Sequence, residues 1–276
     1  MRNGRKWVVA GTVASLVATA ACVPATSDAR STGTPDESRS TSSSERTPTK
    51  SATADRPPLH GRVIVVDPGH NGANAAHPQR INKLVDAGGL RKPCNTVGAE
   101  TDGGYPEHAL NWAVTKRLTK RLRAHGATVI LTRKNDHGVG PCMDERGRTA
   151  ARHDADLLVS VHADGSSARA HGFTVLRPAK VPGYTAGTFG ESRSLATDVA
   201  DALAGHGFTR STYLGKNGIE ARDDLGTLNL ARSPAAMVEM GNMRNTADAK
   251  VLRSAKGRKR MVRGLTAGVV DYLARG

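Results

Sequence analysis

Residues 62–70 read Arg-Val-Ile-Val-Val-Asp-Pro-Gly-His, an apolar run that ends in a proline–glycine turn and a histidine. A short, continuous apolar run between turn signals is typical of a strand that is buried on both faces, as in a parallel sheet. Comparable runs occupy 127–132, 156–162, 172–176 and 235–240. The sequence therefore predicts several buried strands within one sheet.

Helical patterns alternate with these runs. A helix is predicted from Pro106, with Glu107 in its first turn, because apolar residues then recur every four positions until Gly126. Further helices are predicted over 144–153, 192–204 and 247–274, the last broken near Gly257. This alternation indicates an α/β domain whose mostly parallel, twisted sheet is flanked by helices on both faces. Residues 71–104 show no sustained periodicity and predict a long loop.

The N-terminus has the features of an export signal. Basic residues within 2–6 precede an apolar run over 7–21 that is too short to span a bilayer comfortably. Ala18-Thr19-Ala20 suits ordinary signal-peptidase cleavage, whereas Thr19-Ala20-Ala21-Cys22 resembles a lipobox in which Thr19 replaces the usual leucine. We therefore predict a signal peptide over 1–22, with two alternatives open: cleavage, or lipidation at Cys22.

Residues 23–59 consist mainly of Ser, Thr, Pro, Ala, Arg and Asp. Such a segment buries too little apolar surface to offset the entropy of ordering it, so we predict a disordered linker. The folded domain then covers 60–276, which is long enough for a substantial core.

The chain is strongly basic, with a formal net charge of +15. Nucleic acid is the usual partner of such a protein, but predicted export and the lack of zinc-finger or aromatic RNA-binding motifs argue against it. Anionic cell-wall polymers are the partner we expect instead, because a basic exported protein concentrates on an anionic surface. Solvated charge without a specific partner is the alternative.

Cys22, Cys94 and Cys142 are the only cysteines. Once Cys22 is removed or lipidated, one pair remains in an oxidising compartment, where disulfides persist. We therefore expect a Cys94–Cys142 disulfide that ties the long loop after the first strand to the loop after the second. Two free thiols are the alternative.

Three chemically unusual residues lie in or beside the predicted strands. His70 follows the first strand, His162 closes the run over 156–162, and Glu239 interrupts the run over 235–240. Ligands of open α/β sheets gather at the carboxyl ends of strands, so these side chains could converge. Either histidine alone would also fit a structural role. A buried carboxylate is costly, so Glu239 is either a salt-bridge partner or a general acid and base beside a metal.

Motifs distributed over 62–274 carry a resemblance to a known family. They are Val65-Val-Asp-Pro-Gly-His70, Pro106-Glu107, Leu131-Thr-Arg133 with Asp144-Glu-Arg146, Ala155-Asp-Leu-Leu-Val-Ser-Val-His162 and Met237-Val-Glu-Met-Gly-Asn242. In this order they resemble the zinc-dependent N-acetylmuramoyl-L-alanine amidases of the amidase_3 type, and the cysteine pair is similar to that of single-domain actinobacterial members. The chain departs from the family in a longer stretch before Glu107 and in Asp164, where asparagine is usual.

This resemblance implies that zinc is bound by His70, Glu107 and His162, with an open position for water. Glu239 would take a proton from the water that attacks the lactyl carbonyl of muramic acid, and would return it to the departing alanine amine. Glu100 is a rival third ligand. We prefer Glu107 because the start of a helix fixes its direction.

The implied protein is an exported autolysin that cleaves peptidoglycan between N-acetylmuramic acid and L-alanine during wall turnover or cell separation. A zinc peptidase that cuts within the stem peptide and a non-catalytic peptidoglycan-binding module are the alternatives. We expect a catalytic domain over 60–276 that acts as a monomer in the cell wall or at the outer face of the membrane. Lipidation of Cys22 would tether it to that membrane.

Overall fold

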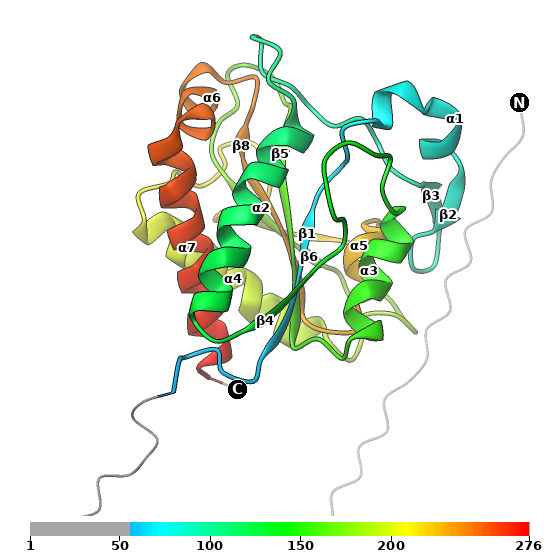
Figure 1. Cartoon of the computed structure of the whole chain (residues 1–276), viewed down its shortest axis with the longest axis vertical. Helices are drawn as coiled ribbons and strands as arrows, with labels where there is room; N and C mark the ends of the chain where they lie inside the picture. The colour runs from blue at the N-terminus through cyan, green and yellow to red at the C-terminus, as the bar shows by residue number, and fades with distance from the viewer. Residues whose placement is uncertain (1–55, 276) are drawn as a thin grey trace, which may run out of the picture. The chain divides into compact units, whose positions relative to one another are not determined.

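The computed structural model describes residues 56–275, which are built around a six-stranded sheet in the order β4-β1-β5-β8-β6-β7 (Figure 1). The strands are β1 (Val63–Pro68), β4 (Thr128–Leu131), β5 (Leu157–Asp164), β6 (Thr174–Pro178), β7 (Ile219–Arg222) and β8 (Ala235–Asn242). β1, β4, β5 and β8 run parallel, whereas β6 is antiparallel to β8 and parallel to β7. The predicted α/β fold with a mostly parallel sheet is confirmed.

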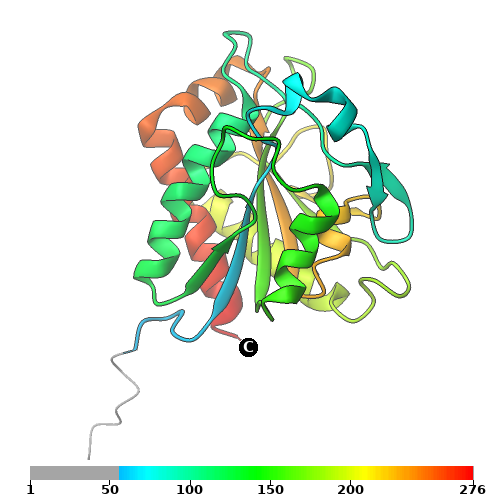
Figure 2. The same ribbon diagram turned by 45° about the vertical axis from the view of Figure 1, so that its right-hand side comes forward.

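Helices cover both faces of the sheet, as the two views in Figures 1 and 2 show. One face packs against α2 (Glu107–Ala124), α4 (Phe189–Gly205) and α7 (Ala255–Leu273), and the other against α3 (Met143–Arg152) and α5 (Gly226–Asn229). Alternation along β1 divides its apolar side chains between the two cores. Ile64 and Val66 join the α2, α4 and α7 core, while Val65 packs with Ala150 of α3 and Leu228 of α5.

Residues 71–104 contain more structure than the loop that the sequence predicts. They form η1 (Asn74–Ala76), α1 (Pro78–Ile81) and a two-stranded hairpin of β2 (Leu84–Asp86) and β3 (Arg91–Pro93). β7 and α5 were also not predicted. Elements of three or four residues are too short to produce a hydrophobic period, so tertiary contacts rather than local pattern define them.

The C-terminal helical region divides earlier than predicted. α6 (Thr246–Arg253) ends at Ser254, whose extended backbone and side chain begin α7, and the Ser254 hydroxyl accepts a hydrogen bond from the Gly257 amide at 2.9 Å. A Cβ at Gly257 would lie 1.9 Å from the carbonyl oxygen of Val251. Gly257 therefore permits close approach of the two helices, and the break itself is a serine cap.

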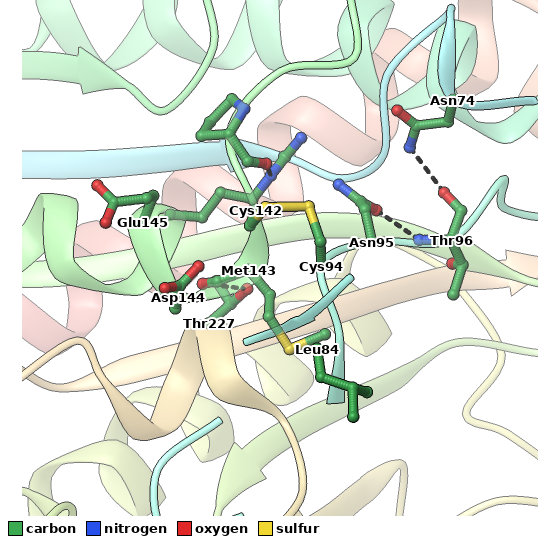
Figure 3. The surroundings of a disulfide bond; sticks show 12 residues. Asn74, Leu84, Cys94, Asn95, Thr96, Cys142, Met143, Asp144, Glu145 and Thr227 are labelled. Carbon is green, nitrogen blue, oxygen red and sulfur yellow. Dashed lines mark hydrogen bonds between the residues drawn. A yellow bond between two sulfur atoms is a disulfide. The ribbon is translucent and has the colours of Figure 1, made fainter. Parts of the chain in front are cut away.

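Cys94 and Cys142 form a disulfide across a sequence separation of 48 residues, as expected from the cysteine count (Figure 3). Cys94 follows β3, and Cys142 immediately precedes α3. The amide of Met143 donates to the carbonyl of Cys94 at 2.8 Å beside the bridge. The disulfide thus fastens the end of the hairpin to α3 and fixes the starting point of the segment over 95–99.

A buried ion pair joins the end of β1 to α3. The Arg146 guanidinium donates to the Asp67 carboxylate at 2.8 Å, to the Pro68 carbonyl at 2.7 Å and to the His70 carbonyl at 2.8 Å. The hydroxyls of Ser160 and Thr132 also donate to Asp67. Burial alone would raise the pKa of Asp67, but Arg146 and these hydroxyls lower it to about 2. Asp67 is therefore ionised and fully hydrogen-bonded in the core.

The predicted signal peptide over 1–22, with Cys22, and most of the predicted linker over 23–59 lie outside the described residues. Among residues 56–275, no helix has the length and apolar character that are needed to cross a membrane.

Removal of the disulfide should destabilise the domain by roughly 2–4 kcal/mol, because the open chain regains the loop entropy that a closure of this length removes. The test compares the urea-unfolding midpoint of the Cys94→Ser/Cys142→Ser double variant with that of the oxidised parent chain. The parent chain treated with reductant should have the same midpoint as the variant. Equal unfolding midpoints for the oxidised chain and the variant would show that the bridge contributes nothing.

Stability should also depend on pH through Asp67. Its folded pKa of about 2 lies below the ordinary value of 3.8, so the ionised carboxylate stabilises the fold above pH 4 and this contribution disappears as the pH falls through 2. The shift corresponds to about 2 kcal/mol. In Asp67→Asn, the free energy of unfolding should be lower at pH 7 and should change less between pH 5 and pH 2.5 than in the parent chain. An exposed control, Asp201→Asn, should follow the parent. Parallel pH profiles for Asp67→Asn and the parent would contradict this assignment.

Candidate metal centre and active site

His70, Glu107 and His162 come together at the carboxyl edge of the sheet. β1 and β5 are neighbours, so His70, just after β1, lies beside His162 of β5, and Glu107 reaches both from the start of α2. One ligand atom from each residue lies within 4.8 Å of the other two. The distances are 3.0 Å from His70 Nε2 to Glu107 Oε2 and 3.0 Å from His162 Nδ1 to Glu107 Oε1. The convergence predicted for the two histidines is therefore present.

Contacts with the backbone fix the orientation of both imidazole rings. The His70 Nδ1 atom lies 3.0 Å from the Thr96 carbonyl, to which it donates, and this leaves Nε2 facing Glu107. The His162 ring lies against Gly69, where a Cβ would come within 2.1 Å of its Cε1 atom. A Cβ at Gly98 would lie 2.8 Å from the Cδ2 atom of His70 and 2.9 Å from Glu107 Oε2. Glycine is thus required at both positions for the rings to take these orientations.

Three hydrogen-bond donors besides the two histidines hold the Glu107 carboxylate. It accepts hydrogen bonds from the Ala99 amide at 2.8 Å, the Ala163 amide at 3.0 Å and the Asn111 side chain at 3.2 Å. Burial alone would raise the pKa of Glu107, but the adjacent histidines hold it well below its usual value. An ionised carboxylate between two imidazoles is an anionic donor set with fixed geometry.

Two other possible ligands close to Glu107 in the sequence, Glu100 and His108, lie outside the cluster. Glu100 is exposed, its backbone bridges to that of Pro106, and it is not part of the His70, Glu107 and His162 cluster. His108 points away from the cluster, with its Nδ1 atom 2.8 Å from the Asp136 carboxylate. Of the two carboxylates, Glu107 lies in the cluster with the histidines and Glu100 does not.

Glu239 lies beside this cluster on β8, in register with His162 on β5. Its Oε2 atom is buried and has no hydrogen-bond partner among residues 56–275. Burial first, and then the negative charges of Glu107 and Asp164, raise the pKa of Glu239 well above its usual value, against an opposing effect of Arg222. No salt bridge holds Glu239 within the described residues. A carboxyl group with this environment is suited to accept and return a proton.

These residues line a cleft of about 490 Å³. Its wall also includes Lys92 of β3, which donates to Asp224 at 2.7 Å, and Arg222 donates to the same carboxylate at 2.8 Å. The hydrogen bond from Arg222 and the contact with Lys92 lower the pKa of Asp224 to about 2, although burial opposes this. The sequence did not indicate Lys92 or Asp224, because neither belongs to a motif and the hairpin that positions Lys92 was not predicted.

Asp164, the departure from the family pattern, also lines the cleft. Its Oδ2 atom accepts a hydrogen bond of 2.6 Å from the Tyr213 hydroxyl, and its Oδ1 atom accepts one of 2.6 Å from the Gly165 amide. Burial and the Asp164 carboxylate raise the pKa of Tyr213. Tyr213 therefore stays protonated and donates to Asp164, which keeps this extra negative charge hydrogen-bonded.

The donor set of the cluster fits zinc. Two imidazole nitrogens and one carboxylate, with room for a further ligand, are typical of catalytic zinc, whereas structural sites use four protein ligands. The Thr96 carbonyl that orients His70 and the amides that orient Glu107 are the kind of outer contacts that such ligands need.

Comparisons with known proteins identify the family of the chain. Residues 64–271 match the family model Amidase_3, described as N-acetylmuramoyl-L-alanine amidase. The chain is 40% identical over 225 residues to the N-acetylmuramoyl-L-alanine amidase Rv3717 of Mycobacterium tuberculosis, which covers 81% of this chain and 91% of the relative.

Two solved structures of the amidase Ami1 are also similar. The one from Mycobacterium smegmatis has a TM-score of 0.75 and 37% identity, covering 79% of this chain and 99% of that one. The apo form from Mycobacterium abscessus has a TM-score of 0.73 and 39% identity, covering 78% of this chain and all of that one. From the family match over residues 64–271 and this agreement of sequence and fold, the chain belongs to the Amidase_3 family of N-acetylmuramoyl-L-alanine amidases.

Proposed function

We propose that the protein is a zinc-dependent hydrolase that cleaves the amide bond between N-acetylmuramic acid and L-alanine in peptidoglycan. The observation that carries the proposal is the unpartnered Glu239 carboxyl group beside the His70, Glu107 and His162 cluster. The family supports the amide substrate, and the donor set supports zinc.

The three clustered residues would hold the metal. His70 would contribute Nε2 and His162 Nδ1, the atoms that face Glu107, while Glu107 supplies a carboxylate that is already ionised. When bound, zinc supplies Lewis acidity that lowers the pKa of a water molecule and polarises a carbonyl. The amides of Ala99 and Ala163 fix the Glu107 carboxylate by hydrogen bonds. Because each Glu107 oxygen also contacts one histidine, the three side chains are positioned before the substrate binds.

Glu239 would act as the general base and then the general acid. It takes a proton from the water that attacks the lactyl carbonyl of muramic acid, and it returns that proton to the alanine nitrogen as the C–N bond breaks. A carboxyl group serves both steps best when its pKa lies closer to the working pH than usual, which is the direction that burial and the neighbouring carboxylates impose on Glu239.

The proposed place of action is the cell wall, outside the cytoplasm, in wall turnover or cell separation. The relatives named as N-acetylmuramoyl-L-alanine amidases support peptidoglycan as the substrate. Zinc dependence, export and the processing of residues 1–22 are parts of the same proposal.

Glu239→Gln should lower kcat on purified muropeptides by at least about 100-fold, because glutamine cannot accept the proton. The variant should keep its zinc content, and Glu191→Gln, the same change on the exposed surface of α4, should leave kcat unchanged. Mass spectrometry of the products of the parent chain should find N-acetylmuramic acid with a free lactyl carboxylate and intact stem peptides that begin with alanine.

Products that retain alanine on muramic acid would identify a stem-peptide peptidase instead. Binding without any hydrolysis by the zinc-loaded parent chain would identify a binding module. Full activity in Glu239→Gln would remove Glu239 from the mechanism while leaving the substrate assignment intact.

A further inference from the structure

The middle of α2 exposes only basic charged side chains. Lys116, Arg117, Lys120 and Arg121 are all exposed. The single acidic residue of this helix is Glu107, which is buried in the metal cluster. Pairs of like charge at i and i+4, such as Lys116 with Lys120, oppose helix formation, so this pattern is not explained by the stability of the helix.

α6 and the first half of α7 continue the same pattern. Lys250 and Arg253 are exposed on α6, and Lys256, Lys259 and Arg263 are exposed on α7. The acidic residue of α6, Asp248, is directed into the domain, where its carboxylate accepts from the amides of Gly172 and Asn242. It therefore does not neutralise the exposed bases.

These helices form one surface. α7 packs against both α2 and α6, and Figures 1 and 2 show the three helices side by side from two directions. We call the exposed Lys and Arg side chains of α2, α6 and α7 up to Arg263 the basic helical face. Since α6 begins at Thr246, shortly after β8 ends at Asn242, this face reaches the edge of the sheet where the cleft opens.

The basic helical face differs from the other helical surfaces in its pairing. On α3, Arg152 pairs with Glu145 at 2.9 Å, and Asp201 of α4 pairs with Arg210 at 2.6 Å. Within residues 56–275, no exposed base of the basic helical face has a carboxylate within ion-pair distance. Solvated surfaces usually carry both positive and negative side chains, whereas a surface that carries only positive charge attracts an anionic partner.

We propose that the basic helical face binds an anionic wall polymer whose charges are phosphodiesters. The proposal rests on the proposed function in placing the enzyme at the wall. A phosphodiester polymer carries one permanent charge in every repeat, so it can contact bases that recur along α2, α6 and α7. Stem-peptide carboxylates are separate charges within a cross-linked mesh, which suits the cleft rather than a long helical surface.

The face is poorly suited to a membrane. Insertion of a surface helix into a bilayer needs large apolar side chains beside the basic ones. Among the described residues, the exposed large apolar side chains are Leu84, Leu90 and Val97, and none lies on α2, α6 or α7. Bound polymer along this face would hold the cleft at the wall without occupying the catalytic groups.

The test is co-sedimentation of the purified full chain with peptidoglycan sacculi over a range of salt concentrations. One sample of sacculi keeps its phosphodiester polymers, and the other is stripped of them with hydrofluoric acid. The variant replaces Lys116, Lys120, Lys256 and Lys259 with glutamine. Its control replaces the exposed bases Arg80, Lys83, Lys134 and Arg232, which lie outside the basic helical face, with glutamine.

On intact sacculi, the first variant should bind at least about tenfold more weakly than the control at physiological salt, and its plot of log affinity against log salt should be shallower by about 3. On stripped sacculi, the two variants should bind equally. Equal binding to intact sacculi, or the same difference on stripped sacculi, would overturn the proposal, as would tighter binding of the parent chain to anionic phospholipid vesicles than to intact sacculi.

Hydrolysis of soluble muropeptides by all these chains separates this proposal from the proposed function. It should be the same in the parent, the variant and the control, because none of the substituted residues lines the cleft. Loss of polymer binding with unchanged hydrolysis supports the face, whereas polymer binding without hydrolysis in the parent would retain the face and refute the amidase.

Discussion

The geometry of the site depends most on the buried ion pair between Arg146 and Asp67. The guanidinium of Arg146 neutralises the buried Asp67 at the end of β1 and also binds the carbonyl of His70. His70 has a φ of 58°, in the left-handed region, which costs a residue other than glycine on the order of 1–3 kcal/mol. Arg146 stabilises the turn in which this backbone conformation directs the imidazole toward Glu107. A buried charge pair that is complete stabilises such an arrangement, whereas loss of either partner would leave an uncompensated charge in the core.

The site separates two carboxyl groups by their surroundings. Glu107 is buried, but it accepts hydrogen bonds from two backbone amides and lies between two histidines. Its pKa is therefore held well below the usual value. Glu239 is a strand neighbour of His162, yet its buried oxygen has no hydrogen-bond donor, and its pKa is raised. Such a pair suits two roles, an anionic ligand and a proton carrier, which is how environment assigns chemistry to identical side chains.

The sequence predicted the sheet and the centre of the site for clear physical reasons. Continuous apolar strands mark a parallel sheet, and the ends of adjacent parallel strands meet, so His70 and His162 converge as expected. Lys92 and Asp224 were not predicted, because the hairpin and β7 are too short to leave a pattern and are positioned by tertiary contacts. The requirement for glycine at 69 and 98 could not be seen either, since it arises from the imidazole rings that pack on them in the folded chain.

The central claim, that the His70, Glu107 and His162 cluster binds a catalytic zinc, is tested most directly by zinc content. Elemental analysis after dialysis should find about one zinc per chain in the parent and in Glu100→Ala, and far less in Glu107→Ala. Glu107→Gln provides a second variant that keeps most of the side-chain hydrogen bonding, and circular dichroism should verify the fold of each. Full zinc content in a folded Glu107→Ala, or loss of zinc in Glu100→Ala, would contradict the assignment of the metal centre.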